Sequence, residues 1–217
     1  MTNFAARLRR ATMAEHREAE TRSFISRLMS GSVPPAGFAA LTAQYLVIYR
    51  ELEAAAEVMR ADPVAGAFAD PALSRVATLE SDLAHLSGPG WASSVVPVAA
   101  TQAYADRLRE HCHTSPAHFI AHHYVRYLGD LSGGLLVGRS VAQTYGLDTA
   151  GVAFYSFEQV SDPKAYKAAY RGRLDALPLA EPDLDLLVAE AQLAFGLNAA
   201  IFAELGATYP EDVVPAA

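Results

Sequence analysis

The sequence predicts an all-α protein with a single domain, and three observations support this. Clusters of glycine and proline, for example at 31–35, 88–97 and 177–182, divide the chain into segments of helical length. None of the segments shows a Val, Ile or Thr alternation long enough for a β-sheet. With 217 residues, 52% of them hydrophobic, the chain can bury one sizeable core.

The expected helices follow in order from the breaks between them. The breaks lie at 31–35, 62–71, 88–97, 114–116, 146–151 and 177–182. The predicted helices are 3–30, 36–61, 72–87, 98–113, 116–145, 163–176 and 183–206. Together they form a multi-helix bundle over residues 1–206, followed by a short polar tail at 207–217.

Charge and cysteine content exclude several classes of protein. A net charge of −7 argues against non-specific nucleic-acid binding, which needs a basic surface. Cys112 is the only cysteine, so neither an intrachain disulfide nor a cysteine-held cluster can form. The N-terminal residues lack an apolar signal core, and the tail is too short and polar to span a bilayer. A cytoplasmic protein without a membrane anchor is therefore expected.

The most informative motif lies within the fifth predicted helix. Gly129, Gly133 and Gly134 fall within six residues, and each helix-interior glycine costs roughly 1 kcal/mol relative to alanine. Close approach of a flat ligand to bare backbone is one reason to retain them. Asp130 would lie at the rim of the face that they open. The motif predicts a helix that covers a ligand.

The first predicted helix carries a second candidate site. Arg9, His16 and Glu20 are separated by seven and four residues and so share one face. A neutral imidazole is the commonest metal ligand, and a carboxylate one turn away can orient its other ring nitrogen. At 1.5 Å per residue, Arg9 lies about 10 Å along the axis from His16.

Two later helices carry weaker signals. Lys167 and Arg171, at i and i+4, can converge on one anionic group or simply form a solvated cationic face. Phe195, Asn198 and Phe202 form one stripe of the last helix, where the Asn198 amide needs a hydrogen-bond partner.

Together these features resemble the haem oxygenase family, from Arg9 to about Leu205. Arg-Tyr-Leu-Gly-Asp-Leu-Ser-Gly-Gly at 126–134 is similar to the family's distal helix, and Ala-Glu-His-Arg-Glu-Ala-Glu at 14–20 to its proximal segment. The resemblance implies a bundle that holds haem between a proximal helix and a kinked distal helix. It also implies cleavage of haem to biliverdin, with the α isomer expected, carbon monoxide and ferrous iron. Haem b would be cofactor and substrate, alongside molecular oxygen and external reducing equivalents.

The same resemblance assigns roles to individual residues. His16 would be the metal ligand to the haem iron, with Glu20 as its hydrogen-bond partner. The residues that it assigns to catalysis and the distal water network are Tyr49, Tyr104, Arg126, Gly129, Asp130 and Asn198. Those that it assigns to haem binding are Arg9, Tyr124, Lys167 and Arg171 at the propionates, Gly129, Gly133 and Gly134 on the distal face, and Phe195 and Phe202 near the porphyrin.

The expected reaction needs an electron donor, because the chain has no flavin motif or cysteine cluster of its own. A ferredoxin or flavodoxin-like reductase system is the expected partner. Basic residues in two segments would frame the haem edge and steer an acidic donor. They are Arg7, Arg9, Arg10, Lys164, Lys167, Arg171 and Arg173, with Lys164 and Arg173 expected to be exposed.

The alternative function is a non-haem metal-binding helical bundle. A di-iron centre would need two Glu-x-x-His motifs, and Glu110 with His113 supplies one. His118 and His122, at i and i+4, are spaced for zinc, although such histidines more often lie on solvated faces. A haem-binding experiment separates these alternatives.

Overall fold

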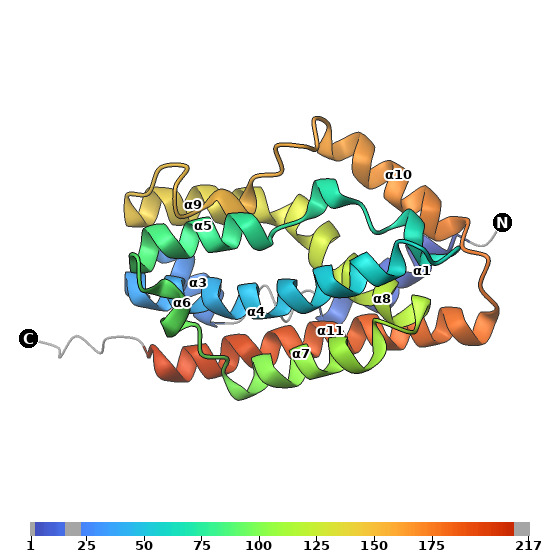
Figure 1. Ribbon diagram of the computed structural model, residues 1–217, viewed down its shortest axis with the longest axis horizontal. Coiled ribbons are helices and arrows are strands. Elements are labelled where there is room, and N and C mark those ends of the chain that lie inside the picture. The colour runs from blue at the N-terminus through green and yellow to red at the C-terminus, as the bar shows by residue number, and fades with distance from the viewer. Residues whose placement is uncertain (1–2, 16–22, 211–217) are drawn as a thin grey trace, which may run out of the picture.

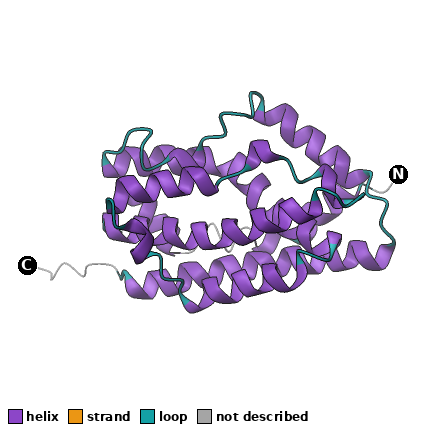
Figure 2. Cartoon of the chain, in the orientation of Figure 1, coloured by secondary structure: helices purple, strands orange, loops and turns teal. Residues whose placement is uncertain are grey.

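All regular structure in the part of the chain that the computed structural model describes, residues 3–15 and 23–210, is helical (Figures 1 and 2). The prediction of an all-α fold is confirmed. In chain order the main helices are α1 (Phe4–Ala11), α3 (Ser23–Ser30), α4 (Pro35–Met59), α5 (Val76–Ser87), α6 (Trp91–Ser94), α7 (Ala99–His111), α8 (Pro116–His123), α9 (Leu135–Tyr145), α10 (Pro163–Asp175) and α11 (Glu181–Thr208).

Shorter helical turns complete the chain between these helices. Three of them are 3₁₀ turns: η1 (Ala65–Ala67), η2 (Pro71–Leu73) and η5 (Ala153–Tyr155). The other two, η3 (Tyr124–Leu128) and η4 (Asp130–Gly134), are wide π-helical turns that link α8 to α9. The sequence predicted neither the short α6 nor these turns.

The core lies between α11 and the helices that surround it. α11 packs against α3, α7 and α8, and α4 packs against α5, α7 and α8. Leu187, Ala191 and Ala194 of α11 are fully buried, at the i, i+4, i+7 spacing of a core-facing stripe. Figure 1 shows α4, α7 and α11 running side by side along the molecule, with α10 and α1 together at one end and α9 at the other. The cavity described below lies where α1, α10 and α11 approach the segment between α8 and α9.

Several predicted helix ends differ from the structure by a few residues, and two of the differences concern the first helix and the C-terminal tail. The helix expected over 3–30 is not continuous, because α1 ends at Ala11 and Thr12 caps it by donating its hydroxyl to the Leu8 carbonyl at 3.0 Å. At the other end of the chain, α11 continues to Thr208. Residues 207 and 208 are thus helical, whereas they were expected in the tail, and 211–217 lie outside the described residues.

Helix α11 has the length and apolar composition that could cross a bilayer, the one such helix among residues 3–15 and 23–210. Core helices of soluble proteins satisfy the same criterion. In this fold α11 packs against α3, α7 and α8 within the bundle.

Candidate active site

The helix predicted over 116–145, called the distal helix below, follows one continuous path but changes its winding in the middle. α8 begins at Pro116 after the N-cap residue Ser115, and α9 ends at Tyr145, followed by the C-cap residue Gly146 with a φ of 66°. Between them lie the two π-helical turns, η3 and η4. Such turns widen a helix locally and occur often at functional sites. The bend expected in this helix is therefore a stretch of wide turns.

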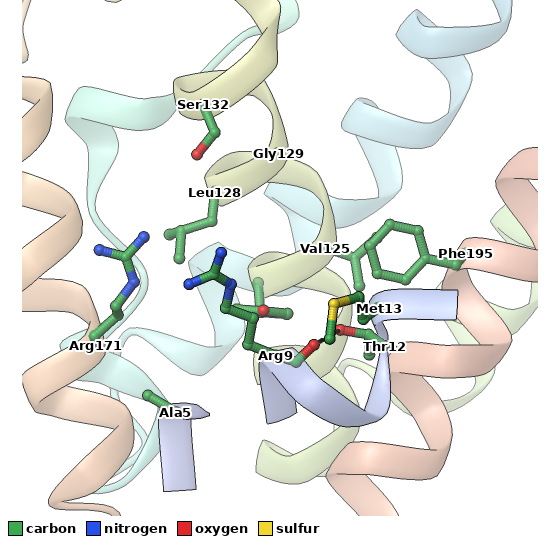
Figure 3. Close-up of a pocket in the computed structure, with 11 residues that line it drawn as sticks. Ala5, Arg9, Thr12, Met13, Val125, Leu128, Gly129, Ser132, Arg171 and Phe195 are labelled. Carbon is green, nitrogen blue, oxygen red and sulfur yellow. Dashed lines mark hydrogen bonds between the residues drawn. The ribbon is translucent and has the colours of Figure 1, made fainter. Parts of the chain in front are cut away.

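A cavity of about 450 Å³ lies beneath these turns, at their junction with α1, α10 and α11. This volume is within the usual range for small-molecule sites. The lining residues are Ala5, Arg9, Thr12, Met13, Tyr124, Val125, Leu128, Gly129, Ser132, Arg171 and Phe195. In Figure 3, Arg171 and the Arg9 guanidinium lie to one side and Met13 and Phe195 to the other, while the distal helix runs down behind them from Ser132 past Gly129.

The glycines of the motif have different surroundings. Gly129 lines the cavity, and a Cβ added to Gly129 or Gly133 would meet no described residue within 4 Å. Gly134 is buried, and a Cβ there would make an ordinary contact with Tyr155 at 3.5 Å. Gly129 thus presents bare backbone to the cavity, whereas Gly134 faces the protein interior.

Sequence reasoning missed Gly138, a glycine of the distal helix that packing requires. A Cβ at Gly138 would lie 2.7 Å from the Tyr155 Cβ, so any larger residue would displace η5. The spacing of Gly134 and Gly138, one helical turn apart, indicates close packing through small residues, but only the fold identifies Tyr155 as the partner.

Asp130 lies at the centre of a polar cluster next to Gly129. The Tyr49 hydroxyl donates a hydrogen bond to Asp130 Oδ2. Arg126 Nε donates to the Tyr49 oxygen at 3.3 Å, and Arg126 Nη1 donates to Asn198 Oδ1 at 2.8 Å. Three helices, α4, the distal helix and α11, thereby place four of the predicted residues in one network. Asn198, which is half-buried, has the hydrogen-bond partner that its amide was expected to need.

Arg126 is held by aromatic rings as well as by hydrogen bonds. Its guanidinium carbon lies 4.5 Å from the ring centroid of Tyr45 and 4.9 Å from that of Tyr49. Its Nη2 atom is buried and has no hydrogen-bond partner among the described residues. A buried cationic donor in this position suits an ordered water or a polar ligand atom.

The electrostatics of the cluster favour proton exchange at Asp130. Burial raises the pKa of the Asp130 carboxyl above its ordinary value, and this outweighs the opposing charge of Arg126 and the hydrogen bond from Tyr49. Burial also raises the pKa of Tyr49 well above its ordinary value. Tyr49 therefore stays protonated and donates, whereas Asp130 can take up and release a proton more readily than an exposed aspartate.

Tyr104 is fully buried on α7, and its hydroxyl pairs with His122 Nδ1 at 3.2 Å. It lies close enough to this cluster for the charges of Arg126 and Asp130 to act on its pKa, although burial, which raises that pKa, is the largest cause. Tyr104 thus links the distal cluster to a second polar network, described under the further inference.

The predicted cationic residues divide into two groups. Arg9 and Arg171 line the cavity directly and are exposed at its edge. Lys167 Nζ instead donates to the Leu131 carbonyl at 3.2 Å and to Ser132 Oγ at 3.4 Å, so it rests on the distal helix beside the cavity. Two of its three N–H groups are thereby used and one remains for a ligand.

The aromatic residues also divide. Tyr124 and Phe195 line the cavity. Phe202, two turns further along α11, is 5% exposed within the hydrophobic core and is not among the cavity-lining residues. The Phe195–Phe202 stripe therefore continues from the cavity into the core.

His16 and Glu20, the expected iron ligand and its partner, lie outside the described residues. Thr12 and Met13 line the cavity, and His16 follows Met13 three positions later in the sequence.

The histidines that suggested zinc have other partners, and the expectation of a solvated face is wrong for them. His122 is fully buried, and its Nε2 lies 2.8 Å from Glu190 Oε1. His118 Nδ1 pairs with Ser115 Oγ at 2.7 Å. Within the described part of the chain, no group of three His, Cys, Asp or Glu side chains could hold a metal ion. Glu190 was missed, although a single carboxylate in the apolar stretch 187–191 is a visible signal.

The expected exposure of Arg173 is also wrong. Its guanidinium carbon lies 5.4 Å from the ring centroid of Tyr170, and Nη1 donates to the Ala67 carbonyl at 2.9 Å. Arg7 forms ion pairs with Glu181 and Asp185 of α11. Neither arginine presents a free charge of the kind expected at the cavity edge.

Comparisons with known proteins identify the family to which the chain belongs. A family model described as Heme oxygenase matches residues 2–204. Heme oxygenase 1 of the cyanobacterium Nostoc sp. is 38% identical over 205 residues, covering 94% of this chain and 86% of that protein. Heme oxygenase 1 of Rattus norvegicus is 35% identical over 208 residues, covering 94% of this chain and 72% of that protein.

Solved structures show the same relationship. The crystal structure of heme oxygenase-1 from the cyanobacterium Synechocystis sp., in complex with heme, has a TM-score of 0.91 and 34% identity to this chain, covering 95% of it and 94% of that chain. The structure of heme oxygenase from Leptospira interrogans has a TM-score of 0.89 and 33% identity. With a family model that matches nearly the whole sequence, this chain belongs to the heme oxygenase family.

Proposed function

We propose that the cavity beneath the distal helix is where this haem oxygenase binds and opens haem. The reaction consumes oxygen and reducing equivalents and yields biliverdin, carbon monoxide and ferrous iron. One observation carries the assignment of the site. The bare backbone of Gly129 faces the cavity, and Asp130, the next residue, belongs to a polar network with Tyr49 and Arg126.

The residues around the cavity fit a porphyrin. Val125, Leu128 and Phe195 supply apolar walls for a flat ring, while Arg9 and Arg171 lie to one side, where two carboxylates would need cations. The open space at Gly129 lets the ring approach the backbone, because no Cβ intervenes. The unpartnered Nη2 of Arg126 gives the network a donor that can hold water beside the ligand.

Bound haem would supply the iron that activates oxygen and the ring that is opened. The protein's own part is to bind, orient and supply protons. Asp130 would hold and release a proton through water, because its raised pKa suits that task. Tyr49 and Arg126 would act as positioning residues that fix the carboxylate and that water. Asn198 would in turn fix Arg126.

The test of this function is reconstitution of the purified protein with hemin. A 1:1 titration with a sharp Soret band, followed by biliverdin, carbon monoxide and released iron on adding oxygen and a reductant, is the expected result. Failure to bind hemin, with metal binding in its place, would favour the non-haem alternative.

His16 is the proposed ligand to the haem iron, with Glu20 orienting its ring. His16→Ala should retain hemin in the cavity, because the apolar walls and cations remain, while turnover collapses. Added imidazole should restore part of the activity by replacing the missing nitrogen. Glu20→Gln, which keeps a hydrogen-bond acceptor, should lose much less. Normal turnover by the unrescued His16 variant would place the ligand elsewhere.

Arg9, Lys167 and Arg171 are the proposed propionate anchors, and they give a prediction on regiochemistry. Charge-assisted contacts contribute about 1.5–3 kcal/mol each, enough to favour one in-plane orientation of the ring by about tenfold or more. Lys167→Ala with Arg171→Ala should therefore convert a single α-biliverdin product into a mixture, measured by chromatography.

A matched control also removes two positive charges, one from α1 and one from α10, but at positions that do not line the cavity. Arg10 and Lys164 are exposed and are not among its lining residues. Arg10→Ala with Lys164→Ala should leave the α product unmixed. A single α product from the Lys167 and Arg171 double variant would show that other groups orient the ring.

The electron donor is proposed to dock beside the cavity on a basic patch defined by Arg9, Arg10, Lys164 and Arg171. All four are exposed, and α1 packs against α10. An acidic ferredoxin or flavodoxin-like protein would be steered there, over a range of about 8 Å at physiological salt. Arg10→Glu with Lys164→Glu should raise the apparent KM for such a donor, and salt should slow donor-dependent but not ascorbate-driven turnover.

Arg139 provides the control for this docking surface. It is exposed on α9, at the other end of the molecule from α1 and α10 (Figure 1). Arg139→Glu should leave the donor's KM unchanged. If the patch variant behaves like Arg139→Glu, the donor docks on another face.

A cytoplasmic location is also proposed, since ferredoxin or flavodoxin-like donors and free thiols such as Cys112 belong to reducing compartments.

A further inference from the structure

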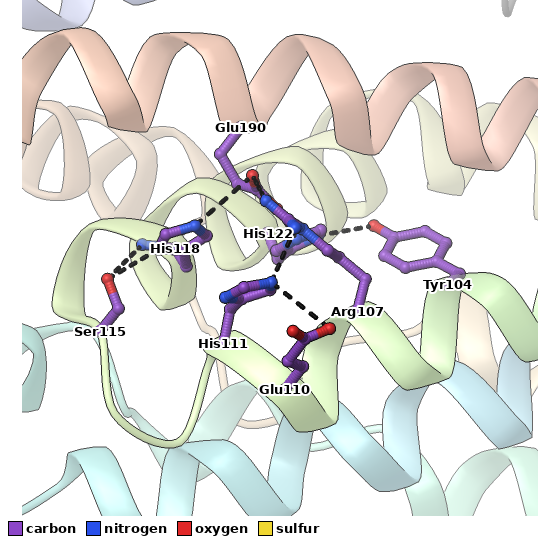
Figure 4. A network of polar contacts seen from close by, with 8 residues as sticks. All are labelled: Tyr104, Arg107, Glu110, His111, Ser115, His118, His122 and Glu190. Atoms are coloured by element: carbon purple, nitrogen blue, oxygen red, sulfur yellow. Dashed lines mark hydrogen bonds and ion pairs between the residues drawn. The ribbon is translucent and has the colours of Figure 1, made fainter.

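A second polar network lies behind the distal cluster, between α7, α8 and α11 (Figure 4). Its centre is Glu190, whose side chain is buried. Arg107 donates to both Glu190 oxygens, from Nε to Oε1 at 2.9 Å and from Nη2 to Oε2 at 2.7 Å. Burial alone would raise the pKa of Glu190, but the hydrogen bonds from Arg107 and His122 hold it well below its ordinary value. Glu190 is therefore a carboxylate and can only accept hydrogen bonds.

This carboxylate determines where His122 carries its proton. His122 Nε2 lies 2.8 Å from Glu190 Oε1, so Nε2 must be the protonated nitrogen. Burial lowers the pKa of His122, so the ring is neutral and has one N–H. Its Nδ1 is consequently an acceptor. Tyr104, 3.2 Å away, must donate its hydroxyl proton to that nitrogen.

The other charged and titratable groups nearby leave the donors and acceptors of this hydrogen-bond chain, from Tyr104 through His122 to Glu190, unchanged. His118 Nε2 lies 3.7 Å from Glu190 Oε2, and His111 Nε2 pairs with Arg107 Nη1 at 2.7 Å. Burial lowers the pKa of His118. On the other side of Tyr104 lie Arg126 and Asp130, near enough for their charges to act on its hydroxyl.

From this chain of hydrogen bonds we infer that Glu190 and His122 are positioning residues that set the direction of the Tyr104 hydroxyl proton. With its proton committed to His122, Tyr104 offers only lone pairs to the distal cluster. The effect on haem turnover rests on the proposed function, whereas the direction of the Tyr104 proton in the haem-free protein does not.

The consequence concerns water beside Asp130. Arg126 Nη2 donates, whereas the Asp130 carboxylate and the Tyr104 oxygen accept. A water in contact with all three would accept from Arg126 and donate to Asp130 and Tyr104. Its orientation would thus be fixed by a carboxylate that does not touch the cavity. If Tyr104 donated into the cluster instead, that order would be reversed.

The direct test is the tautomer of His122 in the haem-free protein. With ¹⁵N-labelled histidine at pH 8, His122 should show the proton on Nε2. Glu190→Gln can donate or accept, so it should allow the Nδ1–H form to appear. Arg107→Gln is the matched control, because it removes an ion-pair partner from the same cluster but leaves the carboxylate on His122. It should lower thermal stability while leaving the tautomer unchanged.

The second test follows the effect into the distal site. In the hemin complex, the optical acid–alkaline transition reports how donors and acceptors surround the ligand position on the iron. His122→Phe removes the acceptor of the Tyr104 proton, so that proton turns toward the distal cluster. The midpoint of the transition should then fall by roughly 0.5 to 1 pH unit, the shift equivalent to one ordinary hydrogen bond. In a Tyr104→Phe background the same substitution should cause no further shift. Glu190→Gln provides the same test should His122→Phe fail to fold.

These outcomes separate the inference from the proposed function. Wild-type His122 protonated on Nδ1, or an equal shift of the transition with and without the Tyr104 hydroxyl, would overturn the inference. Failure to bind hemin would overturn the proposed function while the tautomer in the haem-free protein still tests the positioning of Tyr104.

Discussion

Replacing Asp130 with alanine is expected to lower the rate of biliverdin formation by about 10²- to 10⁴-fold, the range that a positioned proton donor contributes. The carboxylate is the acceptor of the Tyr49 hydroxyl and the neighbour of the Arg126 charge, so its loss leaves both groups without their anchor. Hemin affinity should change little, because Asp130 is not among the residues that line the cavity. Single-turnover absorption spectroscopy with a limiting reductant measures the rate.

Asp130→Asn sharpens this prediction by separating function from stability. A carboxyl whose folded-state pKa is raised stabilises the fold only while it is protonated, and that contribution is lost as the pH rises through the folded-state value. Above the folded-state pKa the ionised Asp130 therefore costs stability, and there the isosteric amide should raise the melting temperature while turnover falls. Biliverdin formation at the wild-type rate in either variant would remove Asp130 from the proton path.

A leucine at Gly129 is expected to block the cavity without harming the fold. Among residues 3–15 and 23–210, no atom outside the local helix lies within 4 Å of the position of a Cβ at Gly129, so the haem-free protein should gain up to about 1 kcal/mol from improved helix propensity. The side chain would occupy the cavity that Gly129 lines. Hemin affinity should fall by roughly tenfold to a hundredfold, since overpacking a formed site costs about 1–3 kcal/mol. Hemin titration and thermal unfolding measure the two effects.

Gly172→Leu is the matched control, because Gly129→Leu is expected to raise stability while lowering hemin affinity. Gly172 lies in α10, is exposed and likewise has open space at its Cβ position. The control should gain similar stability and bind hemin normally. If Gly129→Leu destabilises the haem-free protein, or binds hemin as tightly as the control, then the glycine serves the helix rather than the ligand.

Much of the site was predictable because its residues lie close together in the sequence. Gly129 and Asp130 are adjacent, and a cluster of glycines in a long apolar segment has no purely local explanation. Tyr49, Arg126 and Asn198 came from family resemblance, and the fold brings them into one network from three helices. Helix propensity could not have predicted that these three side chains meet, because α4 and α11 contact the distal helix only when the bundle packs.

The wrong expectations concern exposure, which depends on neighbours far away in the chain. Arg173 follows a basic stretch that resembles a solvated face, yet its guanidinium lies over the rings of Phe68, Tyr166 and Tyr170. The histidines of α8 were likewise expected on a solvated face, because a local cluster of polar residues gives no sign of distant partners. His122 is buried because Glu190, 68 positions later, supplies the acceptor that makes its burial tolerable.

The helical class, the approximate helix ranges and the glycine motif proposed to cover the ligand could be predicted from sequence, because they depend on local spacing and on the cost of glycine within a helix. The packing of the helices then set which residues line the cavity and which face the interior. It placed Gly134 against Tyr155, Lys167 on the Leu131 carbonyl and Tyr104 between two polar networks. The physical reason is that hydrogen-bond partners and buried surface are supplied by segments distant in sequence, so the role of a polar side chain is fixed only when those segments pack.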